Sequence, residues 1–582
     1  MSKNTTHPTE NIEARRHTLA HVLAMAVLSK YPDAKLGIGP VIDNGFYYDF
    51  DIGKNFKEEE LSELEEVMRD ILAHELDITG KKITHAEAKK IFTNQPFKLE
   101  LADEYTEEDK ELTAYTTGEF TDLCRGGHIG NTREIDSSAF KLTRVAGAYW
   151  RGDEKKQQLQ RIYGVAFNTK TELKKYFETL AEAMRRDHKK LGPELDLFTF
   201  SELVGPGLPL WTPKGTLLRN ILDNEVWKLR KHFGYEQVDI PHITKKDLYE
   251  RSGHWDKFKD ELFHVTTREG HEFAMKPMNC PHHTQIYARR QWSYKELPQR
   301  YSNTTKVYRD EQSGEIAGLS RVRSITQDDA HVFCRKTQVK EEMNNVWSII
   351  NSFYKKFGFE LRMRLSLSDP EHPEEYLGSQ TLWKEAESNL RDLVRERGAK
   401  ASEAPGEAAF YGPKIDFLTD DSLGRELQVA TIQLDMNQPE RFDLYCINED
   451  GERERIVMIH AAIMGSLERF ISVIIEHYAG AFPFWLAPVQ IKILSINDKV
   501  VDYAEKIIST LEQRDIRCER DFRNESIGKK IREAEMQKTP YIFVIGDKEV
   551  EANTVNIRTR SKKETSTITL DEFLELIKPE LN

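Results

Sequence analysis

Cys280, His331 and His460 are the residues of this chain whose types could bind a metal ion beside other functional groups. They lie in the segments KPMNCPHH, RVRSITQDDAH and VMIHAAIMGSLERF. One thiolate and two imidazoles would bind zinc with a fourth position open, which is the ligand count of a working zinc rather than a structural one. The three residues are too far apart in sequence for a zinc-finger motif, so their convergence depends on the fold. A buried cysteine with two hydrogen-bonded core histidines is the alternative.

A second group of such residues lies near the N-terminus. His17 and His21 are four residues apart in a segment with helical spacing, so they share one face of the expected helix. Cys124 and His128 form a CxxxH pattern in DLCRGGH. From spacing alone the four residues suggest another metal site, and a structural histidine pair is the alternative.

The composition limits the cellular setting and the partners. The 582 residues include 97 acidic and 84 basic ones, so binding to a nucleic acid would rely on local basic surfaces. Five scattered cysteines are too few for a disulfide framework and favour a reducing compartment. The polar start lacks the apolar core of a signal peptide, and Glu476 and His477 interrupt the most apolar segment, 471–488. A cytoplasmic protein with no membrane partner is expected.

The pattern of apolar residues predicts three kinds of structure along the chain. RRHTLAHVLAMAVLSKY reads as an amphipathic helix, a turn at Asn44 and Gly45 joins two short strands, and a charged helix follows at 57–75. From LDLFTF onward, strands separated by longer helices suit an antiparallel sheet. Beyond Pro488, strands alternate with helices, which predicts a small doubly wound α/β domain with a largely parallel sheet.

Several motifs carry a resemblance to a known family. GYEQVDIPHI, YRDE and GSLERF, in this order, resemble the three signature motifs of class II aminoacyl-tRNA synthetases. KPMNCPHH, TQDDAH, FYGPKID, ATIQLD and IHAAIMGSLERF narrow the resemblance to the threonyl-tRNA synthetase family, and nearly the whole chain is covered. The ubiquitin-like module with which many members begin is expected to be missing.

The resemblance implies an α+β multidomain fold. An α/β editing domain would precede a class II antiparallel sheet with flanking helices, and an α/β anticodon-binding domain would follow. The expected divisions are a disordered tail over 1–10, the editing domain over 11–168, a connecting helix over 169–194, the catalytic domain over 195–480 and the anticodon-binding domain over 488–582.

The implied activity is threonine–tRNA ligation, with threonyl-adenylate as intermediate. Arg309, a planar bidentate donor, would contact the α-phosphate and the attacking carboxylate, and Glu311 would accept from adenine. Arg321 would meet the distal phosphates of ATP, Arg469 would lie over the purine, and Mg²⁺ would accompany the nucleotide. The residues expected at the catalytic and substrate sites are Arg309, Glu311, Arg321, Arg469 and Lys414, with Met278, Gln327, Asp329, Tyr411, Gln428 and Gln433.

The resemblance also implies one Zn²⁺ per subunit, held by Cys280, His331 and His460 and bound by the amino and hydroxyl groups of threonine. Valine lacks the hydroxyl, and a polar site can reject such an analogue by roughly 10⁴ to 10⁵. Serine lacks only a methyl group, which allows discrimination of about 10 to 200-fold. A second, hydrolytic pocket is therefore expected for seryl-tRNA(Thr).

By resemblance, that pocket lies in the N-terminal domain and works without a metal. His17 and Lys98 would handle protons there, and Tyr48 and Asp122 would position the seryl ester. The full set expected at this site is His17, His21, Tyr48, Lys98, Asp122, Cys124 and His128.

The C-terminal domain is expected to read the anticodon of tRNA(Thr), and the enzyme to act as a homodimer. The residues expected at splayed base edges are Asn524, Arg532, Glu549 and Arg558. Lys529 and Lys530 would add phosphate contacts from the same helix as Arg532. Two other classes of function remain as alternatives, a catalytically silent RNA-binding regulator and a zinc hydrolase.

Overall fold

The computed structural model describes residues 8–421, 424–560, 562 and 564–581. The chain divides into two compact units after Ala181. The tail expected over 1–10 lies mostly outside the described residues, and the first helix begins at Pro8.

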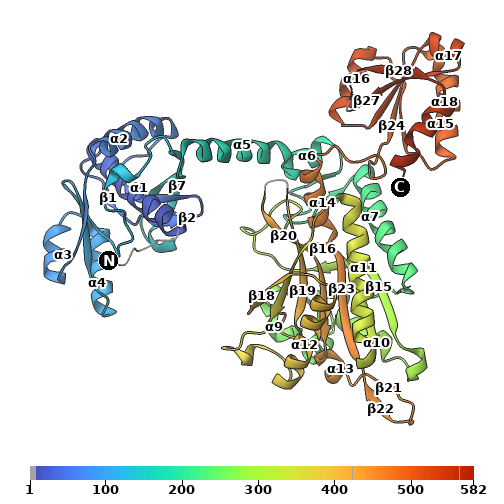
Figure 1. Ribbon diagram of the computed structural model, residues 1–582, viewed down its shortest axis with the longest axis horizontal. Helices are drawn as coiled ribbons and strands as arrows, with labels where there is room; N and C mark the ends of the chain where they lie inside the picture. Colours follow the sequence, from blue (N-terminus) through green and yellow to red (C-terminus); the bar gives the residue numbers. More distant parts are fainter. Residues whose placement is uncertain (1–7, 422–423, 561, 563, 582) are drawn as a thin grey trace. The chain divides into compact units, whose positions relative to one another are not determined.

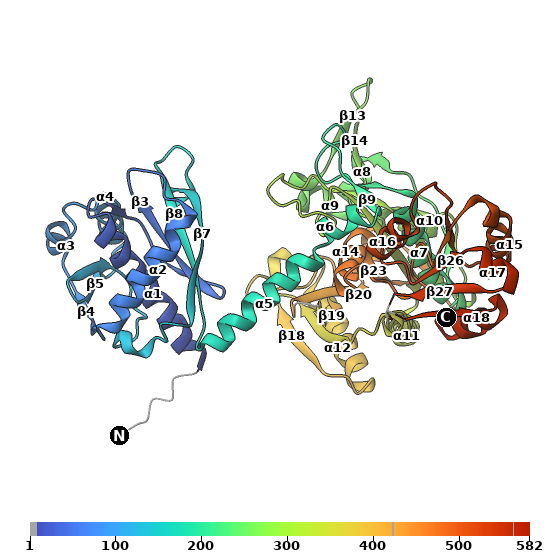
Figure 2. The same cartoon turned by 90° about the horizontal axis from the view of Figure 1, so that it is seen from above.

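The N-terminal unit has two antiparallel sheets and a long buried helix. One sheet has the order β1-β3-β8-β7, with β2 also paired to β3, and the other has the order β4-β5-β6. In Figure 2, α1 and α2 lie beside each other in this unit, and the two helices are in contact. The helices are α1 Pro8–Lys30, α2 Leu61–Ala73, α3 His85–Ile91 and α4 Pro96–Glu107; the strands are β1 Lys35–Leu36, β2 Val41–Ile42, β3 Gly45–Asp51, β4 Ile78–Lys82, β5 Thr113–Thr117, β6 Phe120–Leu123, β7 Phe140–Tyr149 and β8 Gln158–Ala166.

The predicted helix near the N-terminus is present as α1, and the predicted hairpin follows it. The prediction that this helix is amphipathic is wrong, because the residues over 18–24 are all buried and α1 lies in the core of the unit. In the hairpin, β2 pairs with β3. The turn residue before β3 is an asparagine with a φ of 60°, a left-handed conformation that asparagine tolerates.

The single connecting helix predicted over 169–194 is wrong in one respect, because the segment forms two helices. These are α5 Lys170–Arg186 and α6 His188–Glu194. Asp187 interrupts them with a ψ of 120°, and its side chain accepts a hydrogen bond from the backbone of Lys189. Asp187 is therefore the N-cap of α6, a role that the helical spacing of the segment did not reveal.

The second unit contains an eight-stranded sheet of order β11-β15-β16-β23-β20-β19-β17-β18. Its pairs are antiparallel, as predicted, except for β11 with β15 and β17 with β18 at the two edges. Helix α11 packs along β20 and β23 and contacts α7 (Figure 1).

The remaining bounds of this part of the chain are as follows. The helices are α7 Pro213–His232, α8 Lys246–Ser252, α9 His254–Lys257, α10 Cys280–Tyr287, α11 Val339–Phe357, α12 Gln380–Glu396, α13 Asn437–Arg441 and α14 Leu467–His477. The strands are β9 Phe198–Thr199, β10 Leu210–Trp211, β11 Glu236–Gln237, β12 Ile243–Lys245, β13 His264–Thr266, β14 Glu272–Met275, β15 Gln299–Tyr308, β16 Ser324–Cys334, β17 Arg362–Leu367, β18 Ala401–Pro405, β19 Lys414–Asp420, β20 Glu426–Asp435, β21 Tyr445–Ile447, β22 Arg453–Arg455 and β23 Val457–Ser466.

The C-terminal segment forms a five-stranded sheet of order β25-β24-β26-β27-β28. Strands β25, β24 and β26 are parallel, as predicted, but β27 and β28 are antiparallel to their neighbours. The connection over 546–554 explains the reversal, because a parallel crossover needs about a dozen residues or more. The strands are β24 Ile491–Ser495, β25 Cys518–Asp521, β26 Tyr541–Ile545, β27 Val555–Thr559 and β28 Thr565–Ile568, and the helices are α15 Val501–Glu512, α16 Ile527–Met536, α17 Asp547–Ala552 and α18 Leu570–Ile577.

Two predictions about the whole chain concern the membrane and the cysteines. Within the described ranges, no helix is long and apolar enough to cross a bilayer. All five cysteines are free thiols. Cys334 and Cys446 are buried, and Cys518 is half-buried.

Candidate functional site

The fold brings Cys280, His331 and His460 together. Cys280 opens α10, and the two histidines face each other across the β16 and β23 pair. One ligand atom from each of the three residues lies within 4.8 Å of the others, and all three side chains are buried. Nε2 of His331 is 3.1 Å from Nδ1 of His460. The three donors are therefore close enough together to be candidate ligands of one metal ion.

Two further side chains fix the imidazoles of this trio. Oδ2 of Asp435 lies 2.9 Å from Nε2 of His460, and Nδ1 of His283 lies 2.8 Å from Nδ1 of His331. A partner on the far nitrogen is the usual support of a metal-bound histidine. Burial holds the pKa of His331 well below its usual range, so its ring is neutral and able to ligate. These contacts and the soft thiol fit zinc.

Three of the expected threonine-site residues line the trio. Oδ1 of Asp329 is 3.7 Å from Nε2 of His331, and its Oδ2 accepts from Nδ2 of Asn279 at 3.2 Å. The ring of Tyr411 lies 5.2 Å from that of His460, centre to centre. Met278 is close as well, since its sulfur is 3.1 Å from Nε2 of the buried His254. His254 also lies 3.9 Å from the sulfur of Cys280.

The polar residues of β19 and β20 are organised around one buried carboxylate, Asp416. Lys414 forms an ion pair with it at 2.7 Å, and Nε2 of Gln428 donates to its other oxygen at 2.7 Å. Gln433 lies opposite His460 in the register and donates to the backbone oxygen of Gly412 at 2.9 Å. These side chains therefore lie on the same sheet as His331 and His460.

The cationic residues of the motifs lie in the loop between β15 and β16 and on α14. Nε of Arg321 donates to Oε2 of the buried Glu311 at 2.7 Å. Arg309 is half-buried, and its Nε has no hydrogen-bond partner within the described part of the chain. Arg469 is exposed in the first turn of α14, and Gln327 pairs with Ser466 just before that turn. Arg309 and Arg469 thus keep guanidinium donors available for an anionic ligand.

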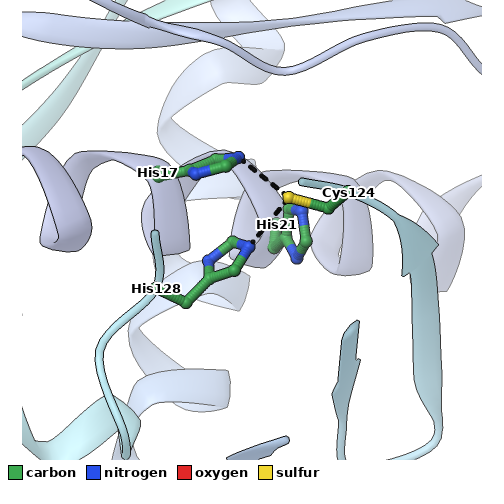
Figure 3. Close-up of side chains that lie close together, drawn as sticks. All are labelled: His17, His21, Cys124 and His128. Carbon is green, nitrogen blue, oxygen red and sulfur yellow. Dashed lines mark hydrogen bonds between the residues drawn. The ribbon is translucent and has the colours of Figure 1, made fainter. Parts of the chain in front are cut away.

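The N-terminal cluster also assembles, as Figure 3 shows. Sγ of Cys124 lies 3.3 Å from Nε2 of His17 and 3.2 Å from Nε2 of His128 (Figure 3). His21 completes a group whose four ligand atoms all lie within 4.8 Å of one another. Burial raises the pKa of the Cys124 thiol to about 11 and lowers that of His128 to about 2.

The loop after β6 gives this cluster its shape. Gly126 and Gly127 have φ values of +99° and +85°, a region that side chains rarely adopt. A Cβ at Gly126 would also come within 2.6 Å of the hydroxyl of Tyr115. The two glycines let the chain reverse so that Cys124 and His128 face the same helix, α1.

Asp122 links the cluster to the other expected editing residues. Its Oδ1 pairs with Nζ of Lys98 at 2.5 Å, and its Oδ2 accepts from the hydroxyl of Tyr48 at 2.5 Å. Nε2 of His21 lies 3.5 Å from the same Oδ2. All four side chains are buried. Burial raises the pKa of Tyr48 well above its usual range, which keeps its hydroxyl a proton donor.

The four residues expected to read an anticodon lie on separate elements of the C-terminal sheet domain. Asn524 is exposed before α16, Arg532 is exposed on α16, Glu549 is on α17, and Arg558 is on β27. The expected phosphate contact from Lys530 is wrong, because its side chain is buried and its Nζ donates to the backbone oxygen of Ser495 at 2.9 Å.

Four residues of these sites were not predicted from the sequence: His254, His283, Asp416 and Asp435. Three of them lie inside the motifs KPMNCPHH, FYGPKID and ATIQLD, and these motifs could have indicated His283, Asp416 and Asp435. Their contacts depend on strand register and helix packing, which a motif does not display. His254 lies in SGHWDKF, a segment outside those motifs.

Three protein families match parts of the chain. They are described as the tRNA synthetase class II core domain (G, H, P, S and T), over residues 263–478, the anticodon binding domain, over 487–580, and the threonyl and alanyl tRNA synthetase second additional domain, over 112–163.

Similar whole proteins and solved structures were also found. A threonine–tRNA ligase of Clostridium tetani is 48% identical, covering 97% of this chain and 88% of that protein. One of Thermotoga petrophila is 46% identical, covering 98% and 88%. The RNA binding domain of threonyl-tRNA synthetase from Cryptosporidium parvum aligns with a TM-score of 0.64 and 37% identity, over 68% of this chain and 98% of that one. A Giardia lamblia prolyl-tRNA synthetase, at a TM-score of 0.56 and 17% identity over 69% and 79%, shares the fold.

Proposed function

Because the chain belongs to the threonine–tRNA ligase family, we propose that Cys280, His331 and His460 hold the zinc ion with which it selects threonine. The enzyme activates threonine with ATP and transfers it to tRNA(Thr), with hydrolytic editing of seryl-tRNA(Thr). The zinc assignment rests on three buried ligand atoms that all lie within 4.8 Å of one another. The second ring nitrogen of each histidine also has a partner, which is His283 for His331 and Asp435 for His460.

Zinc, when bound, supplies an open coordination position for the amino and hydroxyl groups of threonine. The protein supplies the remaining contacts. Asp329, with an oxygen 3.7 Å from His331, holds the ammonium group of the substrate, and Tyr411 covers the ring of His460. The site discriminates against valine because a buried polar site lacks a partner when the hydroxyl is missing.

The ATP site uses the motif cations beside the same sheet. Arg309 has a buried Nε without a protein partner in the described ranges, which suits a bidentate contact to the α-phosphate. Arg321 meets the distal phosphates and Glu311 the adenine amino group, and Arg469 covers the purine. Mg²⁺ accompanies ATP. Lys414, Met278, Gln327, Gln428 and Gln433 complete the pocket.

Editing is assigned to the N-terminal cluster. His17 accepts a proton from water, since burial lowers its pKa and keeps its ring neutral. The two carboxylate oxygens of Asp122 contact Lys98 and Tyr48, one oxygen each, and so fix both side chains. The ammonium group of Lys98 and the hydroxyl group of Tyr48 position the seryl ester.

The partners follow from the same assignment. Asn524, Arg532, Glu549 and Arg558 read the anticodon of tRNA(Thr), and Lys529 adds a phosphate contact. The enzyme acts as a homodimer in the cytoplasm, and its five free cysteines suit that reducing compartment.

Amino-acid-dependent ATP–pyrophosphate exchange tests this function. Threonine should support exchange best, serine about 10 to 200-fold less well and valine about 10⁴-fold less well. Exchange that needs no threonine, or no exchange with any amino acid, would contradict the proposal. The second outcome is the behaviour of a catalytically silent RNA-binding protein.

A further inference from the structure

The four-residue cluster of the N-terminal unit is a second group of side chains that could bind a metal ion. His17, His21, Cys124 and His128 provide three imidazoles and a thiol from two segments of one unit. A tetrahedral zinc with bonds of its usual length holds its sulfur and nitrogen ligands about 3.5 Å apart. The sulfur of Cys124 already lies 3.3 Å and 3.2 Å from its two nearest imidazole nitrogens.

The contacts of His21 also favour metal binding at this cluster. Its side chain is 3% exposed, yet its Nδ1 has no hydrogen-bond partner among the described residues. A buried ring nitrogen without a partner is costly, and it needs a ligand to satisfy it. The other ring nitrogen lies 3.5 Å from Oδ2 of Asp122, the carboxylate contact that commonly supports a metal-bound histidine.

We propose that this cluster is a second zinc site and that a zinc ion bound there switches editing off. Four protein ligands make a closed tetrahedral site, in contrast to the three ligands Cys280, His331 and His460, and leave no open position for a hydrolytic water. The inference about editing rests on the proposed function of His17. Binding of the metal occupies Nε2 of His17, the lone pair that would accept the proton from water.

Zinc binding at this site has a defined proton balance. The thiol of Cys124 loses its proton to solvent as the sulfur becomes a thiolate ligand, and the imidazoles bind in their neutral forms. Removal of the metal by a chelator returns the proton and frees His17. The inhibition of editing by zinc is therefore reversible. The second zinc ion does not affect threonine activation at the other site.

Zinc stoichiometry provides the first test. Full-length protein carrying one equivalent of zinc is dialysed against buffered free zinc, and the bound metal is counted by elemental analysis. The intact chain should gain a second equivalent, Cys124→Ser should not, and Cys518→Ser should behave as the intact chain. Cys518 is the matched control because it is also half-buried but lies outside the metal-binding groups found among the described residues. A single equivalent in all three proteins would overturn the proposal.

Cobalt offers a readout that does not depend on activity. A second equivalent of Co²⁺ should add a thiolate-to-cobalt absorption band in the intact chain and in Cys518→Ser, and none in Cys124→Ser. A second equivalent that adds no such band would place the metal elsewhere and overturn the assignment.

Deacylation of seryl-tRNA(Thr) tests the switch itself. At one zinc equivalent the intact enzyme should deacylate, and the rate should fall by about 100-fold as the second equivalent binds, because the proton acceptor is lost. No deacylation at one equivalent would refute the editing assignment of His17, whereas zinc-independent or zinc-stimulated deacylation would refute the switch alone. Threonine-dependent pyrophosphate exchange should be the same at one and two equivalents.

Discussion

Nδ1 of His283 lies 2.8 Å from Nδ1 of His331, and both side chains are buried. The contact fixes which nitrogen of His331 faces His460 and Cys280, because only the other ring nitrogen then remains for a metal. His283 is therefore a positioning residue for the proposed zinc site, acting through His331.

Replacement of His283 by leucine should weaken zinc binding by about 10 to 100-fold, since the far nitrogen of His331 loses its partner. Competition with a chromophoric chelator measures the affinity. His282→Leu is the matched control, because this neighbouring buried histidine has no hydrogen-bond partner on either ring nitrogen within the described residues. Equal affinity in the two variants would show that His283 does not support the metal.

Replacement of Cys280 by serine should remove zinc and threonine activation together. A hydroxyl is a poor substitute for the thiolate, and two imidazoles alone hold zinc weakly. Elemental analysis and pyrophosphate exchange report the two losses. Cys334→Ser serves as the control, because Cys334 is buried and close to His331 in sequence but does not belong to the candidate metal group. Loss of zinc in Cys334→Ser but not in Cys280→Ser would show that Cys334 is the zinc ligand.

The replacement Arg309→Lys should lower threonine activation by about 100-fold while tRNA affinity stays nearly unchanged. Lysine keeps the charge but loses the planar fork that contacts two oxygens at once. Pyrophosphate exchange and filter binding of tRNA(Thr) measure the two effects. Arg395→Lys, on the surface of α12, should leave both unchanged. Near-normal exchange in Arg309→Lys would remove this residue from the catalytic site.

The contrast between His331 and His283 shows how far the sequence could predict the site. His331 and His460 were identifiable as candidate ligands because each lies in a motif dense in functional groups, and strand pairing places them opposite each other. The partners His283 and Asp435 depend on how α10 and β20 meet that strand pair. Motif spacing carries no information about such contacts, because they are set by three-dimensional packing.

The fold was predictable where local patterns decide it. The helical conformation of α1 and the β2–β3 hairpin follow from side-chain spacing and turn chemistry, whereas the burial of α1 on all sides depends on packing against α2 and β3. The break between the two helices at Asp187 was not predicted, because a capping residue inside a charged helical pattern resembles an exposed residue. The burial of Lys530 was not predicted either, because a lysine in a basic segment is expected to be exposed, whereas its Nζ donates a hydrogen bond inside the domain.

Arg532→Gln should weaken tRNA(Thr) binding by about 1 to 3 kcal/mol and leave threonine activation unchanged. Arg532 is exposed on α16, in the domain that matches an anticodon-binding family. The KM for tRNA in aminoacylation, beside pyrophosphate exchange, separates the two effects. Arg514→Gln is a matched exposed control after α15. An equal effect of both variants would indicate general charge attraction rather than a specific contact.

The pH dependence of seryl-tRNA(Thr) deacylation should reveal the buried state of His17. The ring accepts a proton only in its neutral form, which prevails above its pKa. Burial lowers that pKa from 6.5, and although Asp122 opposes the shift, the net direction is downward. The acid limb of the rate profile should therefore lie below pH 6.5, so that editing persists in mildly acidic solution.

His17→Ala should remove this limb and lower deacylation by about 100-fold. His74→Ala is the control, since His74 is exposed on the same unit and its ring contacts only the backbone oxygen of Asp70 in the described structure. The profiles should be recorded at one zinc equivalent, with pyrophosphate exchange as the measure of an intact catalytic unit. An acid limb at or above pH 6.5, or the same limb in His17→Ala, would assign proton transfer to another group, because burial lowers the pKa of His17.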